Sequence, residues 1–327
     1  MRIEQFSLGG HGKIGTALEI GLVNNMPDVA LRATELQFAR LLKDAAGALD
    51  VRLQLFSLAG IERGEAARAR MEGFYADAAT LPQARLDALI VSGAEPRPGD
   101  MRREPWWPGF AALTDWSRDG TISTVFSCLA AHAAVLHLDG IDRRPLPQKL
   151  SGVIACERVL EDPLFAGLPA INPVPHSRRN GVAEDDLTAH GYRVLSRLPY
   201  GDADIFTRQE RSLMVLLQGH PEFDADTLGR EFLHDTGRFL RGECAERPAM
   251  PENYFDRATE ERLHDLAGHA VDAAVLPRYA EIVTGAMPLH SWHGATVRLF
   301  ANWLTLVAAE KTRRAVLSRP SRKRARA

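Results

Sequence analysis

Short apolar runs alternate with longer stretches of helical period along most of the chain. The run that ends near Asn24 is followed by residues 28–45, in which apolar side chains recur every three to four positions. The segments VRLQLFSL and RLDALIVSG repeat this kind of apolar run further along. Such alternation is typical of parallel strands joined by helices. We therefore predict an α/β fold with a mostly parallel sheet flanked by helices on both faces, which is a three-layer, flavodoxin-like arrangement.

The second half of the chain shows a different pattern. RVLSRL, ADIFTRQE and SLMVLLQGH follow one another closely and predict three strands that extend the sheet in antiparallel fashion. KLSGVIACERVL predicts a further strand, whereas the proline-bearing PVPHSRRN predicts a loop. Without an internal repeat or low-complexity linker, residues 1–309 are predicted to form one domain. The basic residues 310–327 predict a solvated tail, which we favour over a nucleic-acid arm.

Composition narrows the classes of function. The 327 residues carry a formal net charge of −2, so the chain lacks the excess of positive charge that would attract nucleic acid or acidic lipid. Small molecules are therefore the expected partners. The three cysteines form no CxxC pair and no metal-site spacing, which favours a reducing compartment and predicts no metal. The N-terminus lacks the pattern of a secretory signal, and no apolar run is long enough to span a bilayer. A cytoplasmic location is the default expectation.

Cys128 lies where a β-branched run changes into an alanine-rich helical pattern, in TISTVFSCLAAHAAVL. A turn between a strand and a helix presents its side chain at the carboxyl edge of the sheet, where open α/β folds bind ligands. The N–H groups that begin the helix favour a thiolate and can also hold an oxyanion. Against a nucleophile, free cysteines are often buried, and glycines do not flank Cys128 as in a G-x-C-x-G elbow. Local sequence therefore leaves both roles open.

His220 and Glu222 lie at the end of another strand pattern, in QGHPEFD. A reactive thiol needs a base within hydrogen-bond reach, and the base needs an acceptor that fixes its tautomer. A spacing of two in an extended segment allows His220 and Glu222 to serve as base and orienting carboxylate. A structural histidine held by the backbone is the alternative. In PVPHSRRN, the arginines could clamp a carboxylate or belong to a solvated loop.

Taken together, the motifs resemble the homoserine O-succinyltransferase (homoserine transacylase) family over roughly residues 15 to 307. The motifs that carry the resemblance occur in the family's order: NNMPDVALRATELQFARLL, LIVSGAEPR, VFSCLAAHAAVLHLDGI, PLPQKLSGV, PHSRRN, GHPEFDADTLGREFLHD, PENYF and SWHGATVRLFANWL. This resemblance implies a fold like that of class I glutamine amidotransferases. It also implies acyl transfer from succinyl-CoA or acetyl-CoA to an amino-acid hydroxyl through an acyl-cysteine, in methionine biosynthesis and without a permanently bound cofactor.

The resemblance assigns roles to individual residues. It implies that Cys128 is the nucleophile, that His220 is the base and that Glu222 orients the base. The backbone N–H groups near Met26 and Leu129 are implied at the oxyanion. Further residues are implied in substrate binding: Lys149, Ser177, Arg178 and His234. A homodimer is an assembly consistent with the resemblance.

The departures from the family pattern concern the substrates. Asp28 and Val29 stand where the family usually has a lysine pair, and His234 replaces an arginine that grips the acceptor carboxylate. The resemblance makes homoserine the first acceptor to consider, but the missing cations count against it and make serine or a related hydroxy acid the second. Gapless counting places Arg97 at the position that correlates with acyl choice, and we predict that Arg97 pairs with the carboxylate of a succinyl group. Glu95 is the alternative at this position.

Two other functions compete with the acyltransferase. A cysteine–histidine–glutamate set on this scaffold also suits an amidohydrolase of glutamine-amidotransferase type, although that activity normally serves a synthetase partner. A non-catalytic paralogue that binds a metabolite or protein is the third hypothesis, because cations are missing on the acceptor side. The joint presence of Cys128, His220 and Glu222 argues against the non-catalytic paralogue.

Overall fold

The computed structural model describes residues 6–7, 17–94, 99–268 and 272–317. Within these ranges the strands form one sheet in the order β1-β3-β2-β5-β6-β11-β10-β9-β7-β8, and β4 pairs with β3. The bounds of the strands are β1 Phe6–Ser7, β2 Leu18–Val23, β3 Val51–Ser57, β4 Tyr75–Asp77, β5 Ala88–Val91, β6 Ser123–Ser127, β7 Arg144–Arg158, β8 Ile171–Gly181, β9 Arg193–Arg197, β10 Ala203–Gln209 and β11 Leu213–Leu217.

The predicted α/β architecture is confirmed. Strands β4, β3, β2, β5, β6 and β11 run parallel, and the antiparallel extension continues through β10, β9, β7 and β8. The antiparallel part is thus larger than the three strands read from the sequence, because β7 and β8 form a long hairpin beyond them. The central strands are buried along their length, as expected for strands covered on both faces.

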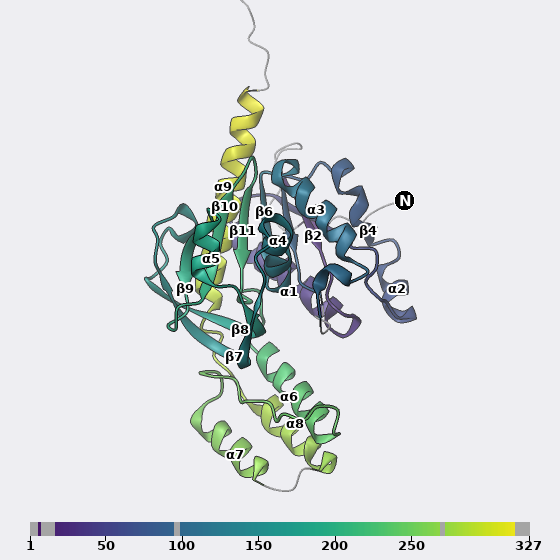
Figure 1. The fold of residues 1–327 in the computed structure, drawn as a ribbon, viewed down its shortest axis with the longest axis vertical. Helices are drawn as coiled ribbons and strands as arrows, with labels where there is room; N and C mark the ends of the chain where they lie inside the picture. The colour runs from purple at the N-terminus through teal and green to yellow at the C-terminus, as the bar shows by residue number, and fades with distance from the viewer. Residues whose placement is uncertain (1–5, 8–16, 95–98, 269–271, 318–327) are drawn as a thin grey trace, which may run out of the picture.

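Helices cover both faces of the sheet (Figure 1). The bounds of the helices are α1 Asp28–Ala46, α2 Glu65–Met71, α3 Trp107–Gly120, α4 Leu129–Asp139, α5 Glu184–Ala189, α6 Thr227–Leu240, α7 Arg257–Ala267, α8 Leu276–Gly285 and α9 His293–Leu317. One apolar core joins α1 and α9 to one face through side chains such as Phe38 and Trp303. A second core joins α3 and α4 to the opposite face through Phe110 and Leu129. Each core lies between the sheet and the helices on one of its faces, so the molecule has three layers.

The PVPHSRRN segment was predicted as a loop, and this prediction is wrong: it lies in β8, which pairs with β7. Proline lacks a backbone N–H and is therefore restricted to edge strands, strand starts and bulges. Because β8 ends the strand order, it has a neighbour on one side only, and Pro173 and Pro175 are tolerated there. The edge position depends on the whole sheet order, which the local sequence does not reveal.

Helices α6, α7 and α8 form a lobe beyond the end of the sheet (Figure 1). The lobe has its own apolar core, which includes Leu228, Tyr254 and Trp292. At Gly152, β7 contacts the segment between α6 and α7, since a Cβ at this glycine would lie only 2.5 Å from the backbone nitrogen of Glu252. Only glycine permits this approach, which fixes the lobe beside the β7–β8 hairpin.

Helix α9 continues to Leu317, so the segment predicted as a tail from residue 310 begins as helix. Residues 318–327 lie outside the described residues. Among the helices of the described ranges, none is both long enough and apolar enough to cross a membrane.

Candidate active site

The candidate site lies at the carboxyl ends of four parallel strands. Because β2, β5, β6 and β11 run in the same direction, the segments that follow them meet at one edge of the sheet. Met26 follows β2, Gly93 follows β5, Cys128 follows β6 and His220 follows β11. Residues that are far apart in sequence are thereby brought to the edge where open α/β folds bind ligands.

Cys128 forms the turn between β6 and α4. Its φ of 52° and ψ of −112° lie outside the regions that a side chain with a Cβ normally adopts, at a cost of about 1–3 kcal/mol. Its backbone N–H donates to the carbonyl of Leu217 at 2.7 Å, which ties the turn to β11. The sharp turn places the thiol at the N-terminus of α4, where unpaired N–H groups and the helix dipole favour negative charge.

His220 and Glu222 are paired as the spacing of two predicted. His220 Nδ1 lies 2.9 Å from Glu222 Oε1, and the side chains of the two residues are 12% and 5% exposed. The imidazole also stacks on Phe223, with ring centroids 4.3 Å apart. Ser127 contributes a second contact to the carboxylate at 3.4 Å. The carboxylate and the aromatic ring hold the imidazole in one orientation.

The charges around His220 determine its protonation. Burial by itself lowers the pKa of His220, but the Cys128 thiolate and the Glu222 carboxylate outweigh it, through their charges and hydrogen bonds, and raise the pKa well above 6.5. The raised pKa corresponds to an imidazolium that lies between two anionic partners. The site therefore favours a protonated imidazole between the Cys128 sulfur and the Glu222 carboxylate.

Two backbone contacts fix the loop that carries His220. The N–H of His220 donates to the carbonyl of Pro175 on β8 at 2.7 Å. Trp292 Nε1 donates to the carbonyl of Phe223 at 2.9 Å. Gly219 is needed here because a Cβ would lie 2.5 Å from Val174 Cγ1. The β8 edge strand and the Trp292 segment together position His220.

Met26 lies in the segment between β2 and α1, and Leu129 begins α4. Leu129 is the first residue of α4, so its N–H has no partner within the helix. A Cβ on Gly93 would lie 3.3 Å from this nitrogen, so the loop after β5 approaches it closely. The N–H of Met26 is 3.3 Å from Asn24 Oδ1, and Arg63 donates to the Met26 carbonyl.

A polar cluster, which we call the Lys149 cluster, joins β7, β8 and α6. It consists of Lys149, Ser177, Glu231, His234 and Asp235. Lys149 Nζ lies 2.8 Å from Asp235 Oδ2 and 3.7 Å from Glu231 Oε2, and Ser177 donates to Glu231. His234, which is 65% exposed, lies 3.5 Å from Asp235. Sequence reasoning missed Glu231 and Asp235, although their spacing of four places both on one face of a helix.

Two arginines that were predicted to bind substrate, Arg178 and Arg97, do not belong to this cluster. Arg178 is buried, and its guanidinium donates to the carbonyl of Asn180 at 2.7 Å and to Asp202 at 3.2 Å. The protein itself therefore satisfies much of its hydrogen-bonding capacity, and its role in the substrate pocket stays a prediction. Arg97 and the alternative Glu95 lie outside the described residues.

Cys156, His176 and Asp204 form a second, fully buried cluster, with ligand atoms within 4.8 Å of one another. His176 Nε2 lies 3.4 Å from Asp204 Oδ1 and 3.7 Å from Cys156 Sγ. However, Arg178 Nε donates to His176 Nδ1 at 3.4 Å, so the ring proton is on Nε2. A histidine that binds metal through Nε2 carries its proton on Nδ1 and donates it to an acceptor. The arrangement therefore fits a hydrogen-bonded network better than a metal site.

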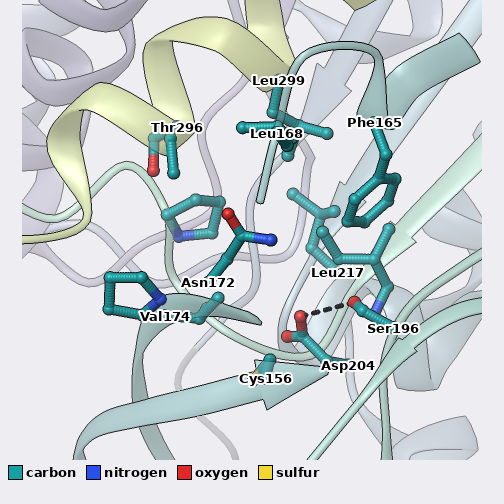
Figure 2. A pocket seen from close by; sticks show the side chains of 14 residues that line it. Cys156, Phe165, Leu168, Asn172, Val174, Ser196, Asp204, Leu217, Thr296 and Leu299 are labelled. Atoms are coloured by element: carbon teal, nitrogen blue, oxygen red, sulfur yellow. Dashed lines mark hydrogen bonds between the residues drawn. The ribbon is translucent and has the colours of Figure 1, made fainter. Parts of the chain in front are cut away.

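Figure 2 shows Cys156 and Asp204 among the side chains that line a cavity. The volume of the cavity is about 30 Å³, and Pro221 also lines it. The cavity lies behind the His220 loop, its walls are largely apolar, and Cys128 is not among the lining residues. This volume holds only about one or two water molecules, whereas sites for drug-sized ligands measure about 300–1,000 Å³. The cavity is therefore too small to bind an acyl-CoA.

Comparisons with known proteins give the family. The model of the family described as "HTS: Homoserine O-succinyltransferase" matches residues 11–314. A homoserine O-succinyltransferase of Rhodopseudomonas palustris is 49% identical over 296 residues, which are 90% of this chain and 89% of that protein. One of Methylorubrum extorquens is also 49% identical, over 89% of this chain and 87% of that protein. A solved glutamine amidotransferase of Thermotoga maritima aligns with a TM-score of 0.49 and 11% identity, over 89% of this chain and 98% of that chain. The chain belongs to the homoserine O-succinyltransferase family, whose members are acyltransferases of methionine biosynthesis.

Proposed function

We propose that this chain transfers a succinyl group from succinyl-CoA to the hydroxyl of homoserine through an acyl-Cys128 intermediate. The observation that carries the proposal is the set of three side chains, Cys128, His220 and Glu222, at the carboxyl edge of the parallel strands. Its support is the strained turn at Cys128, the 2.9 Å contact between His220 and Glu222, and the raised pKa of His220. These features are the ones that nucleophilic catalysis by a thiol requires.

In the first half-reaction, the Cys128 sulfur attacks the carbonyl carbon of the thioester. The developing oxyanion is held by the N–H groups of Leu129 and Met26, after a small movement that frees Met26 from Asn24. The bond between the carbonyl carbon and the coenzyme A sulfur then breaks. His220 gives its proton to the departing sulfur, so that coenzyme A leaves as a thiol and His220 becomes neutral.

In the second half-reaction, neutral His220 takes the proton from the acceptor hydroxyl while the hydroxyl oxygen attacks the acyl-cysteine. Collapse of the tetrahedral intermediate breaks the bond to Cys128 and releases the O-acyl amino acid. The thiolate and the imidazolium are regenerated together, so atoms and protons balance over the cycle. Glu222 keeps the imidazole in the orientation that both proton transfers need.

The Lys149 cluster is the proposed site for the amino and carboxyl groups of homoserine. Glu231 and Asp235 offer carboxylates to an ammonium group, and Lys149 offers a cation to a carboxylate. The three charges pair with one another in this structure, so substrate would exchange these contacts for its own. His234, which is exposed beside Asp235, is a further side chain available to the acceptor carboxylate.

The donor and the location are part of the same proposal. We propose succinyl-CoA rather than acetyl-CoA as the donor because the two relatives described above are named homoserine O-succinyltransferase. Cys128, Cys156 and Cys244 are all free, which supports the reducing conditions of the cytoplasm. We propose no permanently bound cofactor, since every step is assigned to a side chain or a backbone N–H. The homodimer stays a prediction.

Steady-state turnover with chromatographic detection of the O-acyl product tests the proposal. Purified protein is supplied with homoserine or serine and with succinyl-CoA or acetyl-CoA, and Cys128→Ala is the matched variant. We expect O-succinylhomoserine from the wild type and none above background from Cys128→Ala. Glutamine hydrolysis without any reaction of coenzyme A thioesters would instead support the amidohydrolase. Inactivity toward both substrate classes would support a non-catalytic paralogue.

A further inference from the structure

His132 and Gln218 form a buried hydrogen bond between the helix that follows the nucleophile and the strand that leads to the base. His132 Nε2 lies 2.9 Å from Gln218 Oε1, and the two residues are 3% and 0% exposed. His132 belongs to α4, one helical turn after Cys128, whereas Gln218 follows β11 directly and comes two residues before His220. The contact therefore joins the two halves of the candidate site.

The amide of Gln218 has partners on both of its polar atoms. Its oxygen also accepts the backbone N–H of Val182 at 3.0 Å, and its nitrogen donates to the carbonyl of Ala203 at 2.6 Å. Because the oxygen is the atom that faces His132, the Nε2 of that ring carries the proton. Burial lowers the pKa of His132 to about 4, so the ring is neutral at neutral pH. Buried polar groups that are satisfied in this way hold one another in a single arrangement.

Helix α4 needs a directional contact of this kind because its apolar surface has no preferred side. Every residue from 129 to 136 is buried, and a helix that is apolar all round has no single stripe that sets its rotation. The N–H of Cys128 donates to the carbonyl of Leu217 at 2.7 Å, which ties the start of the helix to the end of β11. The bond between His132 and Gln218 adds a second tie one turn further along, so that the rotation of α4 relative to β11 is fixed.

We propose that His132 and Gln218 are positioning residues, whose hydrogen bond sets the spacing between the Cys128 sulfur and the His220 imidazole. This inference rests on the proposed function, which assigns the nucleophile and the base. Neither positioning residue takes part in the chemistry; each acts through the element that carries it. Their effect on rate can still be large, because a displacement of about 1 Å between reacting groups can cost about a hundredfold in rate.

Alkylation of Cys128 by iodoacetamide as a function of pH, with Cys244 replaced by serine, tests the assignment without any acyl donor. His132→Leu and Gln218→Met each remove the hydrogen bond and keep a side chain of similar size. We expect both to move rapid alkylation to higher pH, because the imidazole of His220 is no longer held beside the sulfur. Both should also slow acylation by succinyl-CoA by about tenfold to a hundredfold. His132→Gln keeps an N–H that can reach Gln218 and should restore most of the loss.

Ser123→Ala is the matched control for effects on folding. Ser123 Oγ accepts from Trp303 Nε1 at 2.9 Å, so this substitution also removes a buried hydrogen bond between a helix and the sheet. Ser123 begins β6 and therefore lies at the end of the strand opposite to Cys128. The control should lower the unfolding temperature and leave the alkylation profile and the acylation rate close to those of the wild type.

Three results would overturn the assignment. Alkylation profiles of His132→Leu and Gln218→Met that coincide with the wild type would show that the contact does not set the spacing. A double variant whose shift equals the sum of the two single shifts would show that the residues act independently. The same shift in Ser123→Ala would attribute the effect to folding. A wild type that is alkylated as expected but never acylated by succinyl-CoA would refute the proposed function alone, because alkylation involves no acyl donor.

Discussion

Replacing Glu222 by glutamine removes a charge from the candidate site and leaves its shape. Glu222 Oε1 lies 2.9 Å from His220 Nδ1 in a buried pair, and glutamine can still offer an oxygen to that nitrogen. What is lost is the negative charge that helps to raise the pKa of His220. A hydrogen bond to a charged group contributes about 1.5–3 kcal/mol. At about 1.4 kcal/mol per factor of ten, we expect the population of the thiolate–imidazolium pair at neutral pH to fall about tenfold to a hundredfold.

Alkylation of Cys128 by iodoacetamide as a function of pH measures that population, because only the thiolate reacts. Cys156 is buried and Cys244 is replaced by serine in the background, so the signal reports one thiol. A raised pKa keeps His220 cationic from acid pH to well above 6.5, and the cation is lost as the pH rises through the raised value. In Glu222→Gln the cation is lost at a lower pH, so rapid alkylation should require a higher pH than in the wild type.

The control for this experiment is Glu161→Gln, which removes a carboxylate that is 84% exposed. Its alkylation profile should superimpose on that of the wild type. Profiles that coincide for Glu222→Gln and the wild type would refute the idea that Glu222 holds the imidazolium. A parallel loss of unfolding temperature and reactivity in Glu222→Gln would attribute the effect to folding.

Further substitutions test other parts of the site. Glu231→Gln should raise the KM for homoserine by about tenfold without slowing acyl-enzyme formation, and slower acylation would contradict its place on the acceptor side. Gly219→Ala places a Cβ 2.5 Å from Val174 Cγ1 and should destabilise the fold by about 1–3 kcal/mol, measured by urea unfolding; unchanged stability would show that the loop has room. Burial raises the pKa of Asp235, but Lys149 outweighs burial and lowers it. The stability that Asp235 contributes is therefore present above about pH 4 and is lost as the pH falls through the lowered pKa, so Asp235→Asn and the wild type should converge in acid; a gap that persists at pH 2 would contradict this.

Local sequence predicted those parts of the fold that depend on period and spacing. The order of strands and helices followed from apolar runs, and Cys128 at a strand-to-helix turn followed from a change of pattern. His220 and Glu222 were predicted to pair because residues two apart in an extended segment share a side. The positive φ of Cys128 was not predicted from its neighbours, since no glycine marks the turn.

The remaining parts depend on contacts between distant segments. PVPHSRRN forms an edge strand because the sheet ends there, and the prolines alone suggested a loop. Glu231 and Asp235 on α6 meet Lys149 on β7, and helical spacing could indicate the pair of acids but not their partner. Tertiary placement, rather than local pattern, decides these assignments.

Intact-mass spectrometry of the protein mixed with succinyl-CoA in the absence of homoserine measures the covalent intermediate itself. We predict one succinyl adduct on the wild type, mapped by peptide digestion to Cys128, which disappears when homoserine is added. Cys128→Ala should carry no adduct. An adduct that persists in Cys128→Ala, or a wild type that releases O-succinylhomoserine without ever carrying the acyl group, would contradict transfer through Cys128.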